Sequence, residues 1–141
     1  MDFIRNEIFE EQNVIVTGGA GFIGSALIRN LLLKTSAKII NFDKISYASD
    51  LDSINHLIDN RKNKIDASRY KLLKIDLAKK KDVDEALFSL NPSLVIHLAA
   101  ESHVDKSIEG PEIFIQSNII GTFNILEASR CYYKTLKNFK K

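Results

Sequence analysis

A cluster of glycines between an apolar run and a helix-like segment is the feature of this chain that could do chemistry. The glycines are Gly18, Gly19, Gly21 and Gly24. Residues 14–16 predict a buried strand, and the segment from Phe22 predicts a helix. A strand, a glycine turn and a helix together bring backbone N–H groups and a positive helix end to a diphosphate. We assign the tight turn to Gly18, the close approach of phosphates to Gly21, and close helix–strand packing to Gly24.

A carboxylate follows the second predicted strand, residues 38–42. Asp43 lies about 20 residues past the glycines, where an acidic residue can take both ribose hydroxyls of an adenosine. Its charge would repel a 2′-phosphate, so NAD is favoured over NADP, although Lys44 beside it weakens that preference. The glycine turn and the carboxylate together predict a dinucleotide site. An ordinary strand-to-helix turn followed by a loop carboxylate is the alternative.

The predicted elements alternate along the chain. Strands are expected at residues 13–17, 38–42, 70–75 and 94–98, with helices at 22–34, 51–60, 82–90 and 111–133. Asp82, with Glu85 three residues later, predicts a capping box for the third helix. The alternation predicts an α/β fold, a Rossmann-type doubly wound parallel sheet that is incomplete at about four βα units. Residues 1–141 are expected to form one NAD-binding Rossmann domain that stops before a fifth strand.

Other candidate residues follow the third and fourth strands, because ligands of open α/β sheets bind at the carboxyl ends of the strands. Asp76 either receives a hydrogen bond from an adenine amino group or caps its own strand end. Ala99 and Ala100 are small where a cofactor needs close backbone approach. The three histidines are too scattered along the sequence to suggest a metal site.

Composition and charge narrow the classes of protein. The chain is 45% hydrophobic and 27% charged, as in ordinary globular proteins, and its net charge of +2 is too small to argue for nucleic acid. The single cysteine, Cys131, allows no internal disulfide and is interpreted as a packing residue. No signal peptide and no apolar run of about 18 residues is present, which predicts a cytoplasmic protein without membrane attachment.

The last predicted helix is apolar on more than one side. Ile115, Ile119, Phe123 and Leu126 line one face, and further apolar residues lie on others. A helix on the outside of a sheet needs only one apolar face. Two interpretations stay open, which are burial under another part of the same chain and a subunit interface that makes a homodimer through residues 111–133.

Three stretches carry a resemblance to a known family. They are VTGGAGFIGS at residues 16–25, DKISYA at 43–48 with a leucine at 51, and HLAAESHVDKS at 97–107, followed by GP at 110–111 and NIIGT at 118–122. The sequence resembles the extended short-chain dehydrogenase/reductase family, and within it the nucleotide-sugar dehydratases, from about residue 12 to residue 130.

The resemblance implies NAD as the cofactor, with contacts that fall into four groups. Phe22 and Ile23 would follow the glycines; Asp43, Lys44, Ile45 and Ser46 would hold the adenosine ribose; Asp76 and Leu77 would meet the adenine; and Leu98, Ala99, Ala100 and Glu101 would pass the nicotinamide. Ser117 stands where the family has threonine. Ser102 would contact the substrate, dTDP-glucose or a related sugar nucleotide. Ser49 and Asp50 depart from the family's Gly-Asn, which weakens the assignment of the ribose loop.

The chemistry that the resemblance implies is redox-neutral overall. C4 of the glucose is oxidised, water leaves across C5 and C6, and a hydride returns to C6. The family's Tyr-x-x-x-Lys pair and its Asp-Glu pair have no assigned counterpart here. Tyr133 and Lys137 fit the first spacing but lie past the matching stretch, so no residue is assigned as catalytic. The chain is therefore expected to be inactive by itself. Another sugar-nucleotide epimerase or dehydratase, and a non-catalytic dinucleotide-binding module, are the alternatives.

Overall fold

The structure, a computed structural model, describes residues 9–46 and 49–138. Tyr47 and Ala48, which belong to the second stretch of the resemblance, lie outside the described residues. The chain divides into two compact units. The first is formed by Met1–Lys74 with Pro92–Leu98, and the second by Ile75–Asn91 with Ala99–Lys141.

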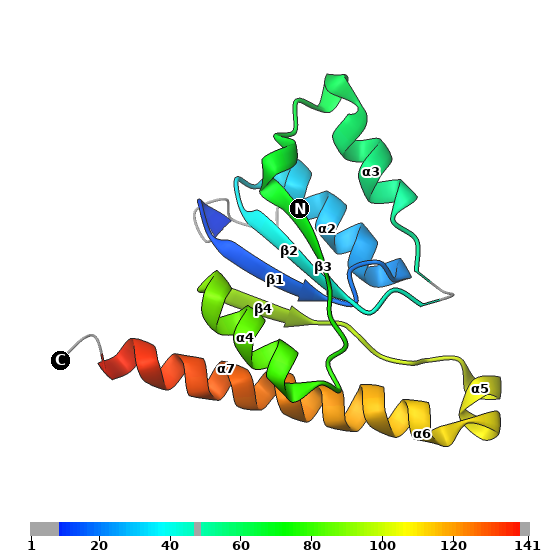
Figure 1. The fold of residues 1–141 in the computed structure, drawn as a ribbon. Helices are drawn as coiled ribbons and strands as arrows, with labels where there is room; N and C mark the ends of the chain where they lie inside the picture. The colour runs from blue at the N-terminus through cyan, green and yellow to red at the C-terminus, as the bar shows by residue number, and fades with distance from the viewer. Residues whose placement is uncertain (1–8, 47–48, 139–141) are drawn as a thin grey trace. The chain divides into compact units, whose positions relative to one another are not determined.

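The first unit holds a sheet of four strands in the order β3-β2-β1-β4 (Figure 1). The strands are β1 (Asn13–Thr17), β2 (Lys38–Asp43), β3 (Tyr70–Lys74) and β4 (Leu94–His97). Every neighbouring pair is parallel. The chain moves outward from β1 through β2 to β3, and then returns to the other side of β1 as β4. A reversal of this kind marks the place where ligands bind in open α/β sheets, and the Rossmann-type prediction is confirmed.

The core of the first unit is apolar and centred on β1, β2 and α2 (Phe22–Lys34). Its buried residues are Val14, Val16, Ile28, Leu31, Leu32, Ala37, Ile39 and Ile54. Ile54 comes from α3 (Asp52–Asp59), one residue shorter at each end than predicted. Strand β2 ends one residue later than predicted, and β3 and β4 each end one residue earlier. The buried, largely apolar interiors of β1 and β2 are typical of parallel strands covered on both faces.

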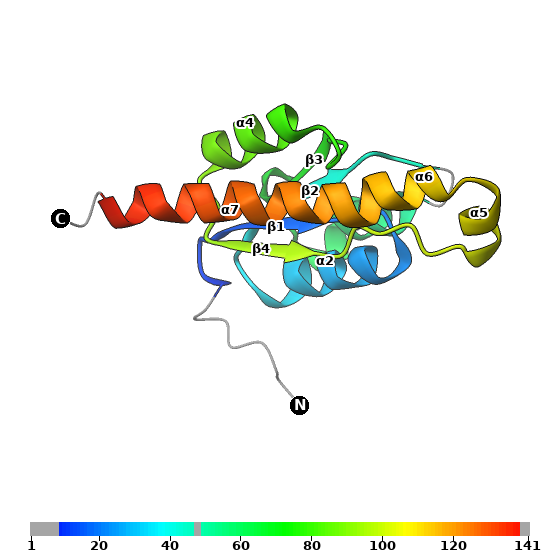
Figure 2. The same cartoon turned by 90° about the horizontal axis from the view of Figure 1, so that it is seen from below.

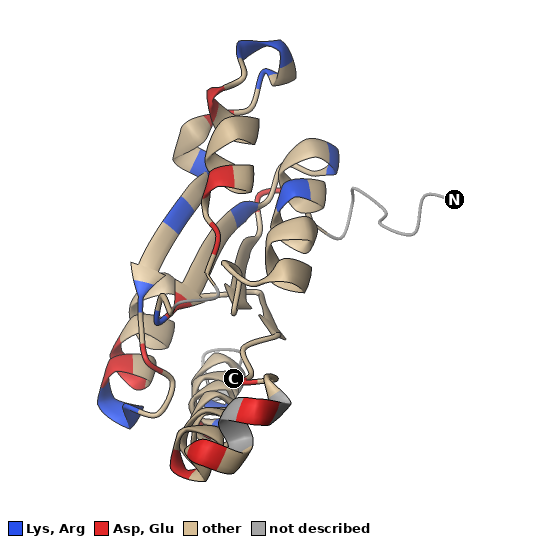
Figure 3. Ribbon diagram, turned by 90° about the vertical axis from the view of Figure 1, so that its right-hand side faces the viewer, with Lys and Arg blue, Asp and Glu red and all other residues tan. Residues whose placement is uncertain are grey.

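Within residues 9–46 and 49–74, the basic side chains of the first unit do not gather into one patch. Figure 3 shows the blue turn after α3, a 3₁₀ turn formed by Arg61–Asn63, where Arg61 and Lys62 are exposed. Lys71 and Lys74 are exposed on β3, which is an edge of the described sheet. Lysines on an edge strand oppose pairing with another strand. These positions fit a solvated surface.

The second unit is helical. It holds α4 (Lys80–Leu90), α5 (Val104–Glu109), α6 (Pro111–Phe114), a π-helical segment (Ile115–Ile120) and α7 (Gly121–Asn138). Helix α4 lies beside α7 (Figure 2), and the rings of Phe88 and Tyr132 meet edge-on with centroids 5.6 Å apart. Val83, Leu87, Ile125 and Ala128 are buried in this unit. No helix in the described part of the chain is both long and apolar enough to cross a membrane.

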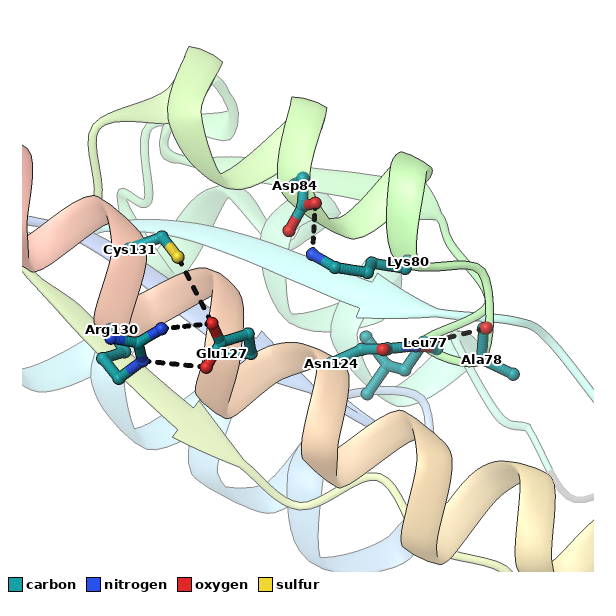
Figure 4. Close-up of polar contacts among 8 residues, drawn as sticks. All are labelled: Leu77, Ala78, Lys80, Asp84, Asn124, Glu127, Arg130 and Cys131. Carbon is teal, nitrogen blue, oxygen red and sulfur yellow. Dashed lines mark hydrogen bonds and ion pairs between the residues drawn. The ribbon is translucent and has the colours of Figure 1, made fainter.

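The predicted capping box at the start of α4 is wrong. The helix begins at Lys80, after Lys79, whose side chain makes no capping hydrogen bond, so Asp82 lies inside the first turn. The preceding turn explains the earlier start, because Asp76 Oδ1 accepts from Ala78 N at 3.0 Å and the Asp76 carbonyl accepts from Lys79 N at 3.0 Å. A Lys80–Asp84 ion pair of 2.6 Å also supports this first turn (Figure 4).

The single helix predicted over residues 111–133 is interrupted. The N–H of Gly121 donates to the carbonyl of Gln116, five residues back, as in a π-helix. The helix also continues five residues beyond its predicted end, to Asn138. The polar segment predicted before it contains the short helix α5. Periodicity alone does not distinguish one long helix from two helical pieces joined by a π segment.

Candidate functional site

The glycine turn after β1 gives structural reasons for two of its glycines, the tight turn at Gly18 and the close approach of α2 to that turn at Gly24. Gly18 has φ of 69°, a conformation that favours glycine. A Cβ on Gly24 would overlap the carbonyl oxygen of Gly18 and lie 2.7 Å from Gly19 Cα, so only glycine allows this packing of α2. A Cβ on Gly21 would meet only Gly18 O, at 3.3 Å. The fold therefore does not require glycine at position 21, and its assignment to phosphate approach stays a prediction.

The backbone amides of the glycine turn, which the sequence predicts to face a diphosphate, already have acceptors within the protein. Gly18 N donates to Phe42 O at 2.8 Å, Gly19 N to Asn41 Oδ1 at 3.0 Å, and Ala20 N to Asp43 Oδ2 at 3.0 Å. Gly21 N donates to Gly18 O at 3.1 Å. An anion at this place must therefore find its donors further along the chain.

The first turn of α2 supplies those donors. Its first helical hydrogen bond runs from Ser25 N to Gly21 O at 2.9 Å, so the amides of Phe22, Ile23 and Gly24 have no acceptor within the helix. The side chains of Phe22 and Ile23 are 94% and 68% exposed. The positive end of the helix dipole lies at the same place. The geometry thus suits a diphosphate bound to the start of α2 rather than to the turn itself.

Asp43, at the end of β2, is 9% exposed and already bound to its own chain. Oδ2 accepts from Ala20 N at 3.0 Å, and Oδ1 accepts from Ile45 N at 2.8 Å and from the Ser49 hydroxyl at 3.4 Å. A carboxylate has about four acceptor positions, so one remains for a ribose hydroxyl. Binding of both hydroxyls by Asp43 stays a prediction.

The loop after β2 contains a residue with positive φ and is held by hydrogen bonds from its own residues. Ile45 has φ of 56°, which is strained for a β-branched residue. Ser46 N donates to the Ser49 hydroxyl at 2.9 Å, and Asp50 N donates to Ala20 O at 2.8 Å. Ser49 and Asp50, the two departures from the family pattern, thus tie this loop to Asp43 and to the glycine turn. Lys44 is only partly exposed.

The ends of β1 and β4 are joined by polar contacts. Leu98 N donates to both Thr17 O and Thr17 Oγ1 at 3.1 Å, and Thr17 Oγ1 lies 2.6 Å from His97 Nδ1. Burial lowers the pKa of His97, which favours the neutral imidazole beside the Thr17 hydroxyl. Leu98 itself is 36% exposed. These hydrogen bonds therefore hold the carboxyl ends of β1 and β4 together at the point where the strand order reverses.

The second unit holds the remaining predicted residues in the turn after β3, in residues 99–102 and in the π-helical segment. Asp76 caps the turn after β3, the alternative that the sequence had left open, and its contact with adenine stays a prediction. Asn124, on α7 and 3% exposed, donates to the carbonyls of Leu77 and Ala78 at 2.8 and 3.2 Å (Figure 4). The sequence did not identify Asn124 as important.

The turn from residue 99 to residue 102 is held by the π-helical segment. Asn118 accepts from Glu101 N at 2.8 Å and donates to Glu101 O at 2.9 Å, so its carboxamide pairs like a neighbouring strand. Ser117 lies beside it in the same segment, partly exposed. Ala100 and Ser102 are exposed, and Ala99 is partly so. The roles of these residues toward NAD and the sugar nucleotide stay predictions.

Residues that sequence analysis set apart from the site lie elsewhere in the second unit. Cys131 Sγ lies 3.5 Å from Glu127 Oε1, and the adjacent Arg130 lowers the pKa of Glu127 to about 2 (Figure 4). Tyr133 is exposed on α7. In the described part of the chain, no group of three or more His, Cys, Asp or Glu residues could hold a metal ion.

Comparison with known proteins places the chain in a family. The model of the family described as GDP-mannose 4,6 dehydratase matches residues 15–140, so the chain belongs to this family. It is 40% identical over 131 residues to the dTDP-glucose 4,6-dehydratase of Neisseria gonorrhoeae, covering 93% of the chain and 36% of that protein. The resemblance seen in the sequence is therefore confirmed.

Two solved structures extend the comparison. One is a double mutant of a Streptomyces venezuelae dTDP-glucose 4,6-dehydratase with NAD and DAU bound, with a TM-score of 0.68 and 30% identity over 82% of the chain and 35% of that protein. The other is the Thermus thermophilus UDP-glucose 4-epimerase in complex with NAD, with a TM-score of 0.67 and 32% identity over 85% of the chain and 34% of that protein. The chain thus spans about a third of the length of the proteins it matches.

Proposed function

We propose that the chain is the NAD-binding part of a dTDP-glucose 4,6-dehydratase. The observation that carries this proposal is the start of α2, where first-turn amides without helical acceptors follow a glycine turn that is already closed by its own hydrogen bonds. A Cβ at position 21 would meet one atom of the protein, so the glycine there is better explained by a ligand than by the fold. The NAD named in the two solved structures supports the same cofactor.

This chain's own residues would divide the work of holding NAD. Phe22 and Ile23 would donate backbone N–H groups to the diphosphate, and Asp43 would accept from the adenosine ribose. Bound NAD would supply reversible hydride storage, so that C4 of the sugar is oxidised, water leaves across C5 and C6, and hydride returns to C6. Ser102 is the candidate contact to dTDP-glucose. A cytoplasmic location is part of this proposal.

NAD affinity measured by calorimetry tests the proposal. Gly21→Val adds a side chain where a diphosphate must approach, and its Cβ meets one protein atom, Gly18 O, at 3.3 Å. We therefore expect at least a tenfold loss of affinity with only a small loss of thermal stability. Ala26→Val, one turn further along α2 and partly exposed, is the matched control and should bind NAD like the wild type. Equal affinity in the wild type and Gly21→Val would refute the site.

Activity of the 141-residue chain is a separate question, and we expect none with dTDP-glucose. Neither of the acid and base pairs that this chemistry needs is assigned in the sequence. NMR of the sugar nucleotide after incubation with the chain and NAD checks this. Formation of a 4-keto product would contradict the expectation and direct attention to Tyr133 and Lys137.

Self-association is the second part of the proposal. Ile119, Phe123 and Leu126 are 58–65% exposed on one helical stretch, while Asn124 and Ile125 between them are buried. Apolar residues grouped in this way mark an interaction surface, and a second copy of the chain is the occupant that we propose. Burial under another part of a longer chain remains the competing explanation, and the oligomeric state decides between them.

A further inference from the structure

Three consecutive residues of β2 hold three consecutive amides of the glycine turn. Asn41 Oδ1, the Phe42 carbonyl and Asp43 Oδ2, which we call the β2 acceptors, accept from Gly19 N, Gly18 N and Ala20 N at 2.8–3.0 Å. Two of these three acceptors are side-chain atoms. The path of the turn is therefore fixed by side chains two residues apart on one strand, which lie on the same face of the sheet.

Asn41 is the least expected of the β2 acceptors. It is 0% exposed, in a strand that is otherwise largely apolar. A Cβ on Gly19 would overlap both the Asn41 carboxamide and Ile28 Cδ1, so the packing of these two side chains already explains the glycine at this position. A buried polar side chain persists only where its hydrogen bonds are satisfied. Asn41 and Gly19 therefore form a matched pair.

The other end of the carboxamide is also fixed. Asn41 Nδ2 donates to the hydroxyl of Tyr70, the first residue of β3, at 3.1 Å. Burial raises the pKa of Tyr70, which keeps its phenol protonated. With Nδ2 held by Tyr70, Oδ1 must face Gly19. A chain of hydrogen bonds thus runs from β3 through β2 to the glycine turn.

We propose that Asn41 is a positioning residue for the diphosphate of the dinucleotide, an inference that rests on the proposed NAD-binding function. By accepting the hydrogen bond from Gly19 N, Asn41 sets the direction in which the chain enters α2. The direction of α2 in turn sets where the Phe22 and Ile23 amides point. Asn41 itself contacts no ligand and acts through the turn.

The test compares NAD with adenosine, which has no phosphate, on variants of the full chain. Asn41→Leu leaves the Gly19 N–H without its acceptor, so NAD affinity should fall about tenfold or more while adenosine affinity changes less than about twofold. Asn41→Asp keeps an oxygen for Gly19 and should retain most of the NAD affinity. Tyr70→Phe keeps Asn41 and serves as a second, milder variant. Asn30→Leu, exposed on α2, is the matched control and should bind like the wild type.

Hydrogen exchange of the Gly19 amide, followed by NMR without ligand, provides the independent measurement. Protection should fall in Asn41→Leu and remain in Asn41→Asp and Asn30→Leu. An equal loss of NAD and adenosine affinity would show a general structural role and overturn the inference, as would unchanged NAD affinity in a folded Asn41→Leu. If Asn41→Leu does not fold, Tyr70→Phe decides the question. A partial loss of NAD affinity with unchanged adenosine affinity in Tyr70→Phe supports the inference, and unchanged NAD affinity in that variant overturns it. A wild-type chain that binds no NAD would instead refute the proposed function.

Discussion

Two regions differ in how far the protein itself pairs or covers their groups. They are the carboxyl ends of β1 and β2 and the apolar face of α7 that includes Phe123 and Leu126. At the strand ends, the turn amides from Gly18 to Gly21 all have acceptors within the first unit. On α7, Phe123 and Leu126 leave more than half of their area exposed to water. A turn whose path is fixed by its own hydrogen bonds can present the first amides of α2 to a small charged ligand without rearrangement. An uncovered apolar face instead favours association with a large surface.

The largest effect that this comparison predicts is at Gly24. Gly24→Ala places a methyl group onto the Gly18 carbonyl, where backbone cannot move aside cheaply, and should lower the free energy of unfolding by about 3 kcal/mol or more. Gly21→Ala, only three residues away, should cost less than about 1 kcal/mol because its Cβ meets a single atom at 3.3 Å. Urea denaturation measures both. Similar losses in the two variants would contradict the geometry of the turn.

The second effect concerns the apolar face of α7. Replacing both Phe123 and Leu126 by Glu should weaken self-association by about a hundredfold, since buried apolar anchors carry most of the energy of an interface. Sedimentation of the wild type and the variant measures the association constant. Leu33→Glu, which is 53% exposed on α2, is the control for a charge placed at an apolar surface position. A wild-type chain that stays monomeric at about 100 µM would rule out the homodimer.

A third, smaller effect tests whether the second unit fixes its turns as the first one does. Asn124→Leu removes both hydrogen bonds to the carbonyls of Leu77 and Ala78 and should cost about 1–3 kcal/mol of unfolding free energy. Asn55→Leu, exposed on α3, should change it by less than about 0.5 kcal/mol. Thermal and urea denaturation provide the measurement. Equal stability of the two variants would mean that the Asn124 contacts contribute nothing.

The sequence predicted the backbone of the first unit well because its signals are local. The bounds of β1 and α2 were predicted to the residue, since an apolar run, four glycines and an amphipathic segment lie next to one another. The start of α4 was missed because Lys80 precedes the residue that resembled a cap. The side chain that fits best as a cap does not begin a helix when an earlier turn has already closed.

The hydrogen-bond partners inside the site were beyond prediction for a different reason. Asn41 bonds to Gly19 and Tyr70, which are 22 and 29 residues away, and Asn124 bonds to Leu77 at a separation of 47. An asparagine within an apolar strand signals a buried polar group, but its partners depend on strand register. The acceptors of the turn amides also lie more than 20 residues away in the sequence, so their hydrogen bonds were not predicted. Resemblance supplied Phe22 and Ile23, and the structure gives the physical reason for them.

The smallest predicted effect is a pH dependence at the junction of β1 and β4. Burial lowers the pKa of His97 below its ordinary value of 6.5, so the unfolded chain binds the proton more readily than the folded one. The stability that this provides is present above the ordinary pKa and is lost as the pH falls through the folded value.

The free energy of unfolding should therefore decrease as the pH is lowered from about 7 to about 5. His97→Asn carries an amide oxygen near the position of Nδ1 and does not titrate, so its stability should depend less on pH than that of the wild type. His56→Asn, at an exposed position of α3, is the matched control. An identical pH slope in the wild type and His97→Asn would show that this junction tolerates a protonated ring. In that case the contact between Thr17 and His97 would not depend on a neutral ring, and the strand ends of the first unit would adapt to a change of charge.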